Sequence, residues 1–481
     1  MVSTEKFIGR EAELARLKHF FHKKTASLIV IRGRRRIGKS RLVEEFAKGT
    51  TFYSFAGLAP TKETTAQSQR DVFAAQLSEQ TGLPEIKADD WSKLFQLLHE
   101  KIKKGRIVLL LDEISWMGAK DPDFLGKIKH AWDQKFKKNP SLVFVICGSA
   151  SAWIEENILS NTGFLGRISY TLTLEELPLN DCAQFWNDNS NNISAYEKFK
   201  LLAVTGGVPR YLEEINPSAS AEENIASLCF RKGGILVDEF EHIFSNMFQR
   251  RTQLYREIVK SLVHAPKQTT EISKLCNVEI TGLLSEYLEE LSLCGFIKRD
   301  YTWNIKTGQD SRLSHYRLSD NYLRFYLRYI EKYKTKIDRG SYEFTTLALL
   351  PEWRTILGLQ FENLVLNNRE YIQSSLNINP ENVISDNPFF QRATNTQPGC
   401  QIDYMIQTKF NTLYVCEIKF SKNPVGVEVI KEVQQKIDRL KRPKGFSCRP
   451  ILIHVNGVTD DLIDEGYFAE IVDFSQLLAK K

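Results

Sequence analysis

The chain lacks the cysteine patterns that mark structural metal sites and disulfide frameworks. Its eight cysteines are scattered over 481 residues, with no Cys-x-x-Cys pair and no His/Cys cluster. This spacing argues against a zinc site and against a disulfide-bonded secreted domain. We therefore expect free, mostly packed thiols in a protein from a reducing compartment.

The sequence also lacks long apolar runs and a strong excess of one charge. The first residues, MVSTEKFIGR, contain no apolar segment of the kind found in signal peptides, and no stretch is long and apolar enough to span a bilayer. The formal net charge of +6 is small for this length, so it allows a nucleic-acid partner without requiring one. We expect a cytoplasmic protein with no membrane contact and about two to four domains.

One segment that is present, Gly33–Ser40, has a specific chemistry. It reads GRRRIGKS and fits the phosphate-binding pattern G-x-x-x-x-G-K-[ST]. An apolar run, Ser27–Ile31, precedes it and a helical pattern, Arg41–Ala47, follows it, as the pattern requires. Glycines let successive backbone N–H groups and a helix N-terminus point at an anion. The alternative is a basic glycine turn that spells the pattern by chance, and the flanking elements argue against it.

This segment predicts a site for ATP and Mg²⁺. Lys39 is expected to reach the β- and γ-phosphates, and Ser40 to give its hydroxyl oxygen to Mg²⁺. The predicted nucleotide-binding residues of the segment are Gly33, Gly38, Lys39, Ser40 and Arg41.

Two later apolar runs end in polar residues. Arg106–Glu113 reads RIVLLLDE and Leu142–Ser149 reads LVFVICGS, which is typical of strands buried in a parallel sheet. After a phosphate-binding loop, Asp112 is expected to hold Mg²⁺ and Glu113 to polarise the attacking water. Ser149 would lie beside the γ-phosphate, although serine at a strand end is also a common turn former.

Two arginines are candidates for contact with the nucleotide. Arg167 lies in FLGRISY and could act as an arginine finger, within one chain or between copies in a homo-oligomer. Arg210 lies in GGVPRYL, where Gly-Gly and Pro mark a break before a short helix. The alternative for both residues is a surface salt bridge.

The segments FIGREAEL, GRRRIGKS, LLLDE, CGS, LGR and GGVPRYL occur in this order over roughly the first half of the chain. In this, the chain resembles the archaeal-type ATPases of the AAA+/STAND group of P-loop proteins. The resemblance implies an α/β fold with a P-loop parallel-sheet core over residues 1–178 and a helical lid over residues 179–250. The family arginine of the LGR segment matches Arg167. At the sensor position Ser149 replaces the Asn or Thr common in wider AAA+ proteins.

The middle of the chain predicts a winged-helix domain over residues 251–320, because three helical patterns precede a hairpin pattern. Its recognition helix would be Ile280–Leu293, whose exposed face is acidic. Carboxylates repel phosphates, so a structural or protein-contact role is favoured over sequence-specific docking on DNA. The basic residues lie instead in the predicted wing, Lys298–Arg317.

A helical linker is predicted over residues 321–352. Its segment Asp320–Lys336, DNYLRFYLRYIEKYKTK, interleaves aromatic and basic residues. Such aromatics could stack on the bases of a single strand. We favour a core stripe with its Arg and Lys on the solvated side, because the aromatics recur at helical spacing.

The last region, residues 353–481, predicts a second chemistry. Two strand patterns, QIDYMIQ and LYVCEIKF, are joined by a hairpin near residues 409–412. Side chains alternate along a strand, so Glu417 and Lys419 share one face, and Asp403 can meet them from the neighbouring strand. A preceding helix presents Glu362. Carboxylates that hold Mg²⁺, with a lysine to orient water, are what phosphodiester hydrolysis needs.

This Asp…Glu-x-Lys order with an upstream Glu resembles the PD-(D/E)XK nucleases over about the last quarter of the chain. The resemblance implies catalytic roles for Asp403, Glu417 and Lys419, with Glu362 as the helical acid, and metal binding by Asp403 and Glu417. It also implies a restriction-endonuclease-like α/β fold. The following helix adds Lys431, Gln434 and Gln435 as candidate substrate contacts.

Two functions remain open from the sequence. The first is an ATPase that couples its nucleotide state to a metal-dependent DNA nuclease-like domain. The second is a nucleotide-dependent switch that binds DNA or protein and has a catalytically silent nuclease fold. The intact set of Asp403, Glu417 and Lys419 favours the first.

Overall fold

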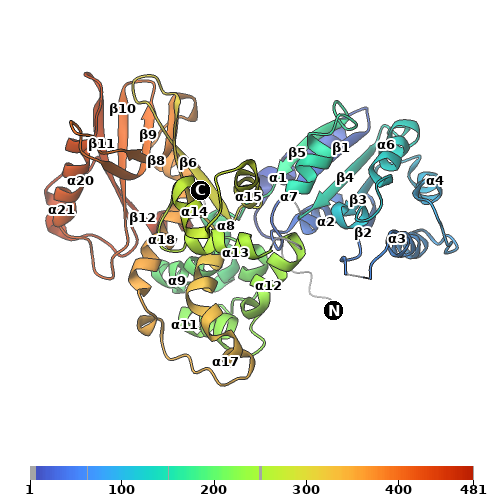
Figure 1. Ribbon diagram of the computed structural model, residues 1–481, viewed down its shortest axis with the longest axis horizontal. Helices are drawn as coiled ribbons and strands as arrows, with labels where there is room; N and C mark the ends of the chain where they lie inside the picture. Colours follow the sequence, from blue (N-terminus) through green and yellow to red (C-terminus); the bar gives the residue numbers. More distant parts are fainter. Residues whose placement is uncertain (1–6, 62, 150, 249–251, 480–481) are drawn as a thin grey trace. The chain divides into compact units, whose positions relative to one another are not determined.

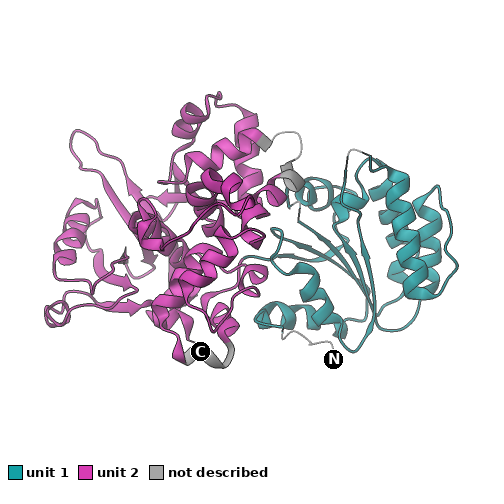
Figure 2. Ribbon diagram, turned by 90° about the horizontal axis from the view of Figure 1, so that it is seen from below, with its two compact units in different colours: residues 1–175 teal, residues 176–481 magenta. Residues whose placement is uncertain are grey.

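A computed structural model describes residues 7–61, 63–149, 151–248 and 252–479. The chain divides into two units, residues 1–175 and residues 176–481 (Figure 2). Within the described ranges, no helix combines the length and the apolar character that crossing a membrane requires.

The first unit is built on a five-stranded sheet in the order β2-β3-β4-β1-β5, in which all neighbouring strands are parallel. The strands are β1 (Ser27–Arg32), β2 (Thr51–Ala56), β3 (Ile107–Asp112), β4 (Leu142–Gly148) and β5 (Ile168–Thr173). The three apolar runs of the sequence form the central strands β1, β3 and β4, as predicted. The edge strands β2 and β5 are partly exposed and contain no continuous apolar run, so the sequence pattern did not predict them.

Helices cover both faces of this sheet because the strand side chains alternate between two apolar layers (Figure 1). In β1, Ile29 and Ile31 pack with α1 (Glu11–His19) and α2 (Lys39–Ala47), while Leu28 and Val30 belong to the opposite layer. That layer also contains residues of α3 (Ala66–Thr81), α4 (Trp91–Ile102), α5 (Ile114–Met117), α6 (Phe124–Gln134) and α7 (Ser151–Ile154). Each fully buried aliphatic side chain contributes about 1.5–3 kcal/mol, so the two layers fix the sheet firmly.

The second unit begins with helices and short helical turns. They are α8 (Leu179–Cys182), η4 (Ala183–Asn192), α9 (Ala195–Thr205), α10 (Pro209–Leu212), α11 (Ala221–Ile225), η5 (Ala226–Phe230) and α12 (Ile235–Phe248). The three helices predicted next are present as α13 (Thr252–Ser261), α14 (Thr269–Cys276) and α15 (Gly282–Leu293). They are followed by an antiparallel hairpin of β6 (Ile297–Trp303) and β7 (Asp310–Leu318).

The aromatic and basic segment after the hairpin is part of the core. It forms α16 (Asn321–Phe325), η7 (Tyr326–Ile330), η8 (Glu331–Tyr333) and α17 (Lys334–Asp338). Tyr322, Tyr326 and Tyr329 are buried, which confirms the core stripe. The solvated position expected for its basic residues is wrong for Arg324, which is 2% exposed. Arg324 tolerates burial because its guanidinium donates to the carbonyls of Val263 and Leu318 and to Gln360.

The chain then passes through η9 (Leu347–Leu349), α18 (Trp353–Leu366), α19 (Arg369–Ser375) and η10 (Pro380–Asn382) into a second, mixed sheet. Its order is β12-β11-β10-β9-β8, with β8, β9 and β10 antiparallel and β10, β11 and β12 parallel. The elements are β8 (Val383–Gln391), β9 (Cys400–Thr408), β10 (Thr412–Lys419), α20 (Glu428–Arg439), β11 (Ser447–His454), α21 (Asp460–Asp464), β12 (Glu470–Asp473) and α22 (Phe474–Leu478). The predicted hairpin of β9 and β10 is therefore present.

One hydrophobic cluster runs through most of the second unit. It joins residues from Leu177 to Leu478 and includes α9, α12, α16, α18 and one face of β10. A second cluster joins the other face of β10 to α20. The subdivision of this unit predicted at residues 320 and 352 stays a prediction, and the boundary predicted at residue 250 lies outside the described residues.

Candidate nucleotide site and carboxylate cluster

The loop between β1 and α2 places Lys39 in the interior of the first unit. Lys39 is 6% exposed and its Nζ donates to the carbonyls of Gly33 at 2.9 Å and Arg34 at 3.0 Å. The loop depends on its glycines: Gly38 has φ +87°, and a Cβ on Gly33 would lie 2.4 Å from the carbonyl oxygen of Leu174. Burial lowers the pKa of Lys39, and the nearby Glu113 carboxylate opposes this shift.

Two oxygen-bearing side chains meet at the start of α2. Ser40 Oγ donates a hydrogen bond to the Asp112 carboxylate at the end of β3. Asp112 also accepts from the N–H of Glu113 at 3.0 Å. A hydroxyl and a carboxylate side by side, next to the phosphate-binding loop, are the hard oxygen donors that Mg²⁺ takes together with phosphates. The residues present therefore fit this ion.

Glu113 and Ser149 form a contact that the sequence did not suggest. Ser149 donates through its Oγ to Glu113 Oε1 at 2.9 Å and Oε2 at 2.8 Å, and through its N–H to Oε2 at 3.1 Å. Glu113 has φ +49°, a left-handed conformation uncommon for a residue with a side chain. Since β3 and β4 are neighbours in the sheet, their ends bring the two residues together. Ser149 thus holds the carboxylate of Glu113.

The remaining residues predicted to contact nucleotide have protein partners. Arg167 makes a two-armed contact with Asp133, Nε to Oδ1 at 3.0 Å and Nη2 to Oδ2 at 2.9 Å. Arg41 contacts Glu44 at 3.4 Å. Arg210 belongs to the second unit, where it pairs with Glu213 at 3.2 Å and with Glu214.

In the second unit, acids from two strands meet at one lysine. Tyr404 on β9 pairs with Cys416 on β10. Asp403 is the residue before Tyr404, and Glu417 is the residue after Cys416, so the two acids lie on neighbouring strands. Asp403 Oδ2 accepts from the N–H of Ile418 at 3.0 Å, and its Oδ1 lies 3.4 Å from Lys436 Nζ. Lys436 Nζ also donates to Glu417 Oε2. We call Glu362, Asp403, Glu417 and Lys436 the carboxylate cluster.

The lysine of this cluster is not the predicted one. Lys419 shares the strand face of Glu417, as expected, but its ammonium pairs with Glu432 on α20. Lys436, which sequence reasoning missed, reaches the acids from the same helix. A signal was present: Val429 and Val433 are buried, and Lys436 continues their stripe at helical spacing. A lysine on the sheet-facing stripe of a helix needs an anionic partner in the sheet.

Electrostatics couple the members of the carboxylate cluster. Burial raises the pKa of Glu417, the Asp403 charge raises it further, and Lys436 opposes the shift. The pKa of Glu362 is raised by the same two causes and opposed by Arg324, Arg317 and Lys436. Carboxylates drawn together against burial and mutual repulsion mark a functional-site candidate rather than ordinary surface charge.

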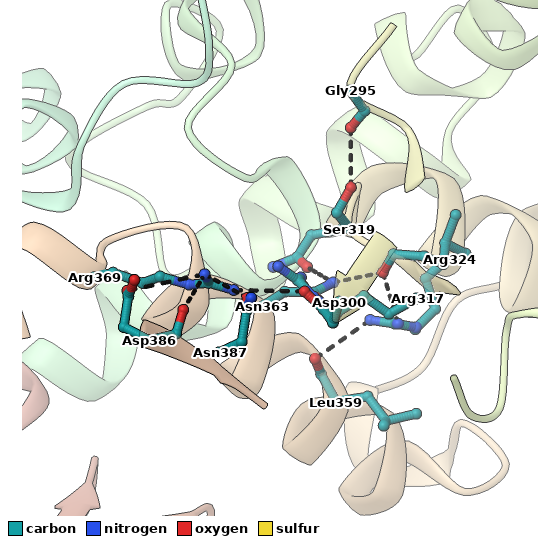
Figure 3. Close-up of polar contacts among 12 residues, drawn as sticks. Gly295, Asp300, Arg317, Ser319, Arg324, Leu359, Asn363, Arg369, Asp386 and Asn387 are labelled. Atoms are coloured by element: carbon teal, nitrogen blue, oxygen red, sulfur yellow. Dashed lines mark hydrogen bonds and ion pairs between the residues drawn. The ribbon is translucent and has the colours of Figure 1, made fainter. Parts of the chain in front are cut away.

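A buried polar network fixes α18, the helix that carries Glu362 (Figure 3). Arg317 on β7 donates to Asp300 at 2.8 Å and to Asn363 at 2.7 Å. Arg369 on α19 donates to Asn387 at 2.7 Å and contacts Asp300 at 3.4 Å. The hairpin, α18, α19 and β8 are therefore tied to one another by charge-assisted hydrogen bonds.

The carboxylate cluster can supply part of a metal site. Within the described ranges, no group of three or more His, Cys, Asp or Glu side chains is arranged to hold a metal ion. Asp403 and Glu417 nevertheless offer oxygens that already contact a cation, Lys436 Nζ. Mg²⁺ is commonly held by one or two carboxylates plus water and substrate phosphate, so this pair fits it.

Comparisons with known proteins agree with the site in the first unit. The family described as an ATPase domain predominantly from Archaea matches residues 7–215. An uncharacterised protein of Methanocaldococcus jannaschii is 23% identical over 360 residues, which cover 74% of this chain and 76% of that protein.

Solved structures of other proteins resemble parts of this chain in fold. The Walker-type ATPase PABY2304 of Pyrococcus abyssi covers 68% of this chain and 97% of its own, with a TM-score of 0.50 and 16% identity. The Aeropyrum pernix ORC2 protein covers 70% of this chain and 96% of its own at a TM-score of 0.41 and 14% identity, too low to assign a shared fold. Together with the loop geometry, the family match supports an ATP-binding domain of archaeal ATPase type in residues 7–215.

Proposed function

We propose that the first unit binds ATP and hydrolyses it. The observation that carries this proposal is the buried Lys39, whose ammonium is oriented by main-chain carbonyls inside a glycine-dependent loop. Lys39 would face the β- and γ-phosphates, and Ser40 and Asp112 would hold Mg²⁺, which supplies charge neutralisation when bound. Glu113 would orient and polarise the attacking water once its carboxylate leaves Ser149.

The test is steady-state phosphate release with purified protein, ATP and Mg²⁺. Glu113→Gln should keep ATP binding and lose turnover, because the amide fills the same space but cannot act as a base. Glu100→Gln is the matched control, since Glu100 is an exposed residue of α4 that pairs with Lys103 away from the loop. Turnover that is equal in the parent and in Glu113→Gln would contradict the assignment.

For the second unit we propose metal-dependent cleavage of DNA at the carboxylate cluster. The supporting observation is that Asp403 and Glu417 contact Lys436, while burial and the Asp403 charge raise the pKa of the neighbouring Glu362. Asp403 and Glu417 would hold Mg²⁺, and the lysines would orient water or balance charge on the phosphate. The winged-helix assignment of residues 251–320 and the coupling of nucleotide state to cleavage are part of the same proposal.

Loss of intact labelled DNA, with Mg²⁺ or Mn²⁺ and with or without ATP, tests this function. Asp403→Asn should lose cleavage because it weakens the metal site, whereas Asp438→Asn, an exposed residue of α20, should not. If the parent cleaves neither single-stranded nor double-stranded DNA, the alternative applies. The chain would then be a nucleotide-dependent switch that binds DNA or protein, with a silent nuclease fold.

A further inference from the structure

A cavity of about 510 Å³ lies within the second unit between β7, β8, β9 and α20. Its walls also include Gln268 at the start of α14. The lining residues are Gln268, Leu313, His315, Phe390, Gln391, Arg392, Gly399, Cys400, Gln401, Lys436 and Arg439. Three of them are permanent cations and none is a carboxylate. A mostly apolar lining with cations in its wall suits a ligand that joins a flat apolar ring to an anionic group.

One wall of the cavity offers aromatic surface. The rings of His315 and Phe390 lie with centroids 4.0 Å apart and planes 35° apart, and Phe390 is partly exposed. Gln401, exposed on β9, adds an amide beside them. A flat ring together with an amide is a combination that binds a nucleobase, by stacking on its face and hydrogen bonding to its edge.

A second wall offers cations. Arg392 is exposed and its Nη2 donates to Gln268 Oε1 at 2.9 Å, while Arg439 is exposed at the end of α20. In the parts of the chain that the structure describes, neither guanidinium has a carboxylate within 4 Å. Their charge is therefore available to phosphate oxygens, which a planar guanidinium binds through two parallel hydrogen bonds.

The cavity adjoins the carboxylate cluster through Lys436. This lysine lines the cavity, and its ammonium contacts both Asp403 and Glu417. Cys400 on β9 also lines the cavity and donates through its Sγ to the carbonyl of Lys436 at 3.2 Å, and Asp403 lies three residues further along the same strand. A nucleotide seated in the cavity would thus hold its neighbouring phosphodiester beside the acids.

We propose that this cavity binds one unpaired nucleotide of a DNA strand, with its base on Phe390 and its phosphate on Arg392 and Arg439. The proposal rests on the nuclease function proposed above and adds its substrate class: a single strand or a frayed end. In an intact duplex both faces of a base are covered by its neighbours, so no base could stack on Phe390 without leaving the helix.

The proposal is tested by binding rather than by cleavage. The probe is a fluorescein-labelled single-stranded DNA oligonucleotide in EDTA, followed by anisotropy, with every protein also carrying Lys39→Ala so that the nucleotide loop does not contribute. Arg392→Ala/Arg439→Ala should weaken binding by about a hundredfold or more, because two charge-assisted hydrogen bonds to phosphate are lost. Phe390→Leu should weaken it by about tenfold, since it keeps apolar volume and removes the stacking surface.

Arg231→Ala/Arg339→Ala is the matched control. It removes the same charge from exposed positions of the same unit that do not line the cavity, and it should leave binding within about twofold. Unchanged thermal unfolding of each variant excludes a folding defect.

Other outcomes separate this proposal from the nuclease function. Binding that depends on Phe390 and on the two arginines, in a protein that cleaves nothing, would support the cavity and refute the nuclease. If the protein cleaves DNA but the cavity variants bind the oligonucleotide as tightly as the parent, the cavity is not the nucleotide-binding site and the nuclease function stands. Free dAMP that binds as tightly as the oligonucleotide, with the same dependence on Phe390, would overturn the strand assignment in favour of a mononucleotide ligand. Blunt duplex that binds as well as single strand would overturn it too.

Discussion

The nucleotide loop contains a buried lysine, Lys39, and the carboxylate cluster contains a partly buried one, Lys436, but the two lysines have different surroundings. Lys39 donates to main-chain carbonyls, which orient its ammonium without neutralising it. Lys436 contacts the carboxylates of Asp403 and Glu417, which carry the opposite charge. The ammonium of Lys39 can therefore bind an anion, such as the phosphates of a nucleotide. The ammonium of Lys436 is already paired with two carboxylates, and a metal ion could take its place beside them. One residue type thus has opposite binding consequences in the two units.

The largest expected effect tests whether Lys39 is needed to bind the phosphates. Lys39→Ala should reduce ATP binding and hydrolysis to background, because it removes the ammonium that main-chain carbonyls hold in place for the phosphates. Equilibrium binding of a fluorescent ATP analogue measures the loss. Lys48→Ala, which removes an exposed lysine just after α2, should behave like the parent. If Lys39→Ala hydrolysed ATP at the parental rate, Lys39 would not be the residue that binds the phosphates, and the contrast with Lys436 would fail.

The next effect concerns Arg167, which already has an anionic partner, as Lys436 does. If Arg167 leaves Asp133 to act on a neighbouring copy, Arg167→Ala should lower turnover by about a thousandfold, the size of an arginine-finger contribution. The rate per chain of the parent should then rise with protein concentration. Mixing Arg167→Ala with Lys39→Ala should restore activity, because each copy supplies what the other lacks. A monomer with concentration-independent turnover would leave Arg167 as a salt bridge.

The two lysines of the second unit provide a smaller and more direct test. Lys436→Met should destabilise the fold by about 2 kcal/mol, because it leaves two poorly solvated acids without their cation. Lys419→Met should cost less than about 0.5 kcal/mol, since Lys419 is partly exposed and its partner Glu432 is exposed. Thermal unfolding of both variants measures the difference. Added Mg²⁺ should recover part of the loss in Lys436→Met only; equal shifts in the two variants would remove the distinction between the lysines.

What the sequence could predict follows the same contrast. The loop Gly33–Ser40 is contiguous, and its geometry follows from glycines, a strand and a helix that are each visible locally, so its site was predictable. The carboxylate cluster joins residues of α18, β9, β10 and α20 that lie up to 74 positions apart, from Glu362 to Lys436. Strand alternation placed Glu417 and Lys419 on one face, but it could not say which lysine would reach the acids, because helix rotation over the sheet decides that.

Partners across neighbouring strands were equally hidden. Strand order is a property of the sheet, and nothing in the runs ending at Glu113 and Ser149 states that β3 and β4 are neighbours. The burial of Arg324 was missed for a related reason, because its partners Val263, Leu318 and Gln360 come from three separate elements. In both cases the sequence showed a polar residue next to apolar ones, but it did not show which groups would form hydrogen bonds with that residue.

The smallest expected effect tests the Glu113–Ser149 contact, which has no counterpart in the carboxylate cluster because its donor is neutral. Ser149→Ala removes the Oγ bonds and leaves the N–H bond to Glu113 Oε2. Losing a hydrogen bond of about 1 kcal/mol should release the carboxylate more often, so we expect turnover to rise about fivefold with ATP binding unchanged. Ser151→Ala, at a buried serine in the following helix, is the control. A fall in turnover would contradict this restraining role of Ser149 and would favour its predicted position beside the γ-phosphate.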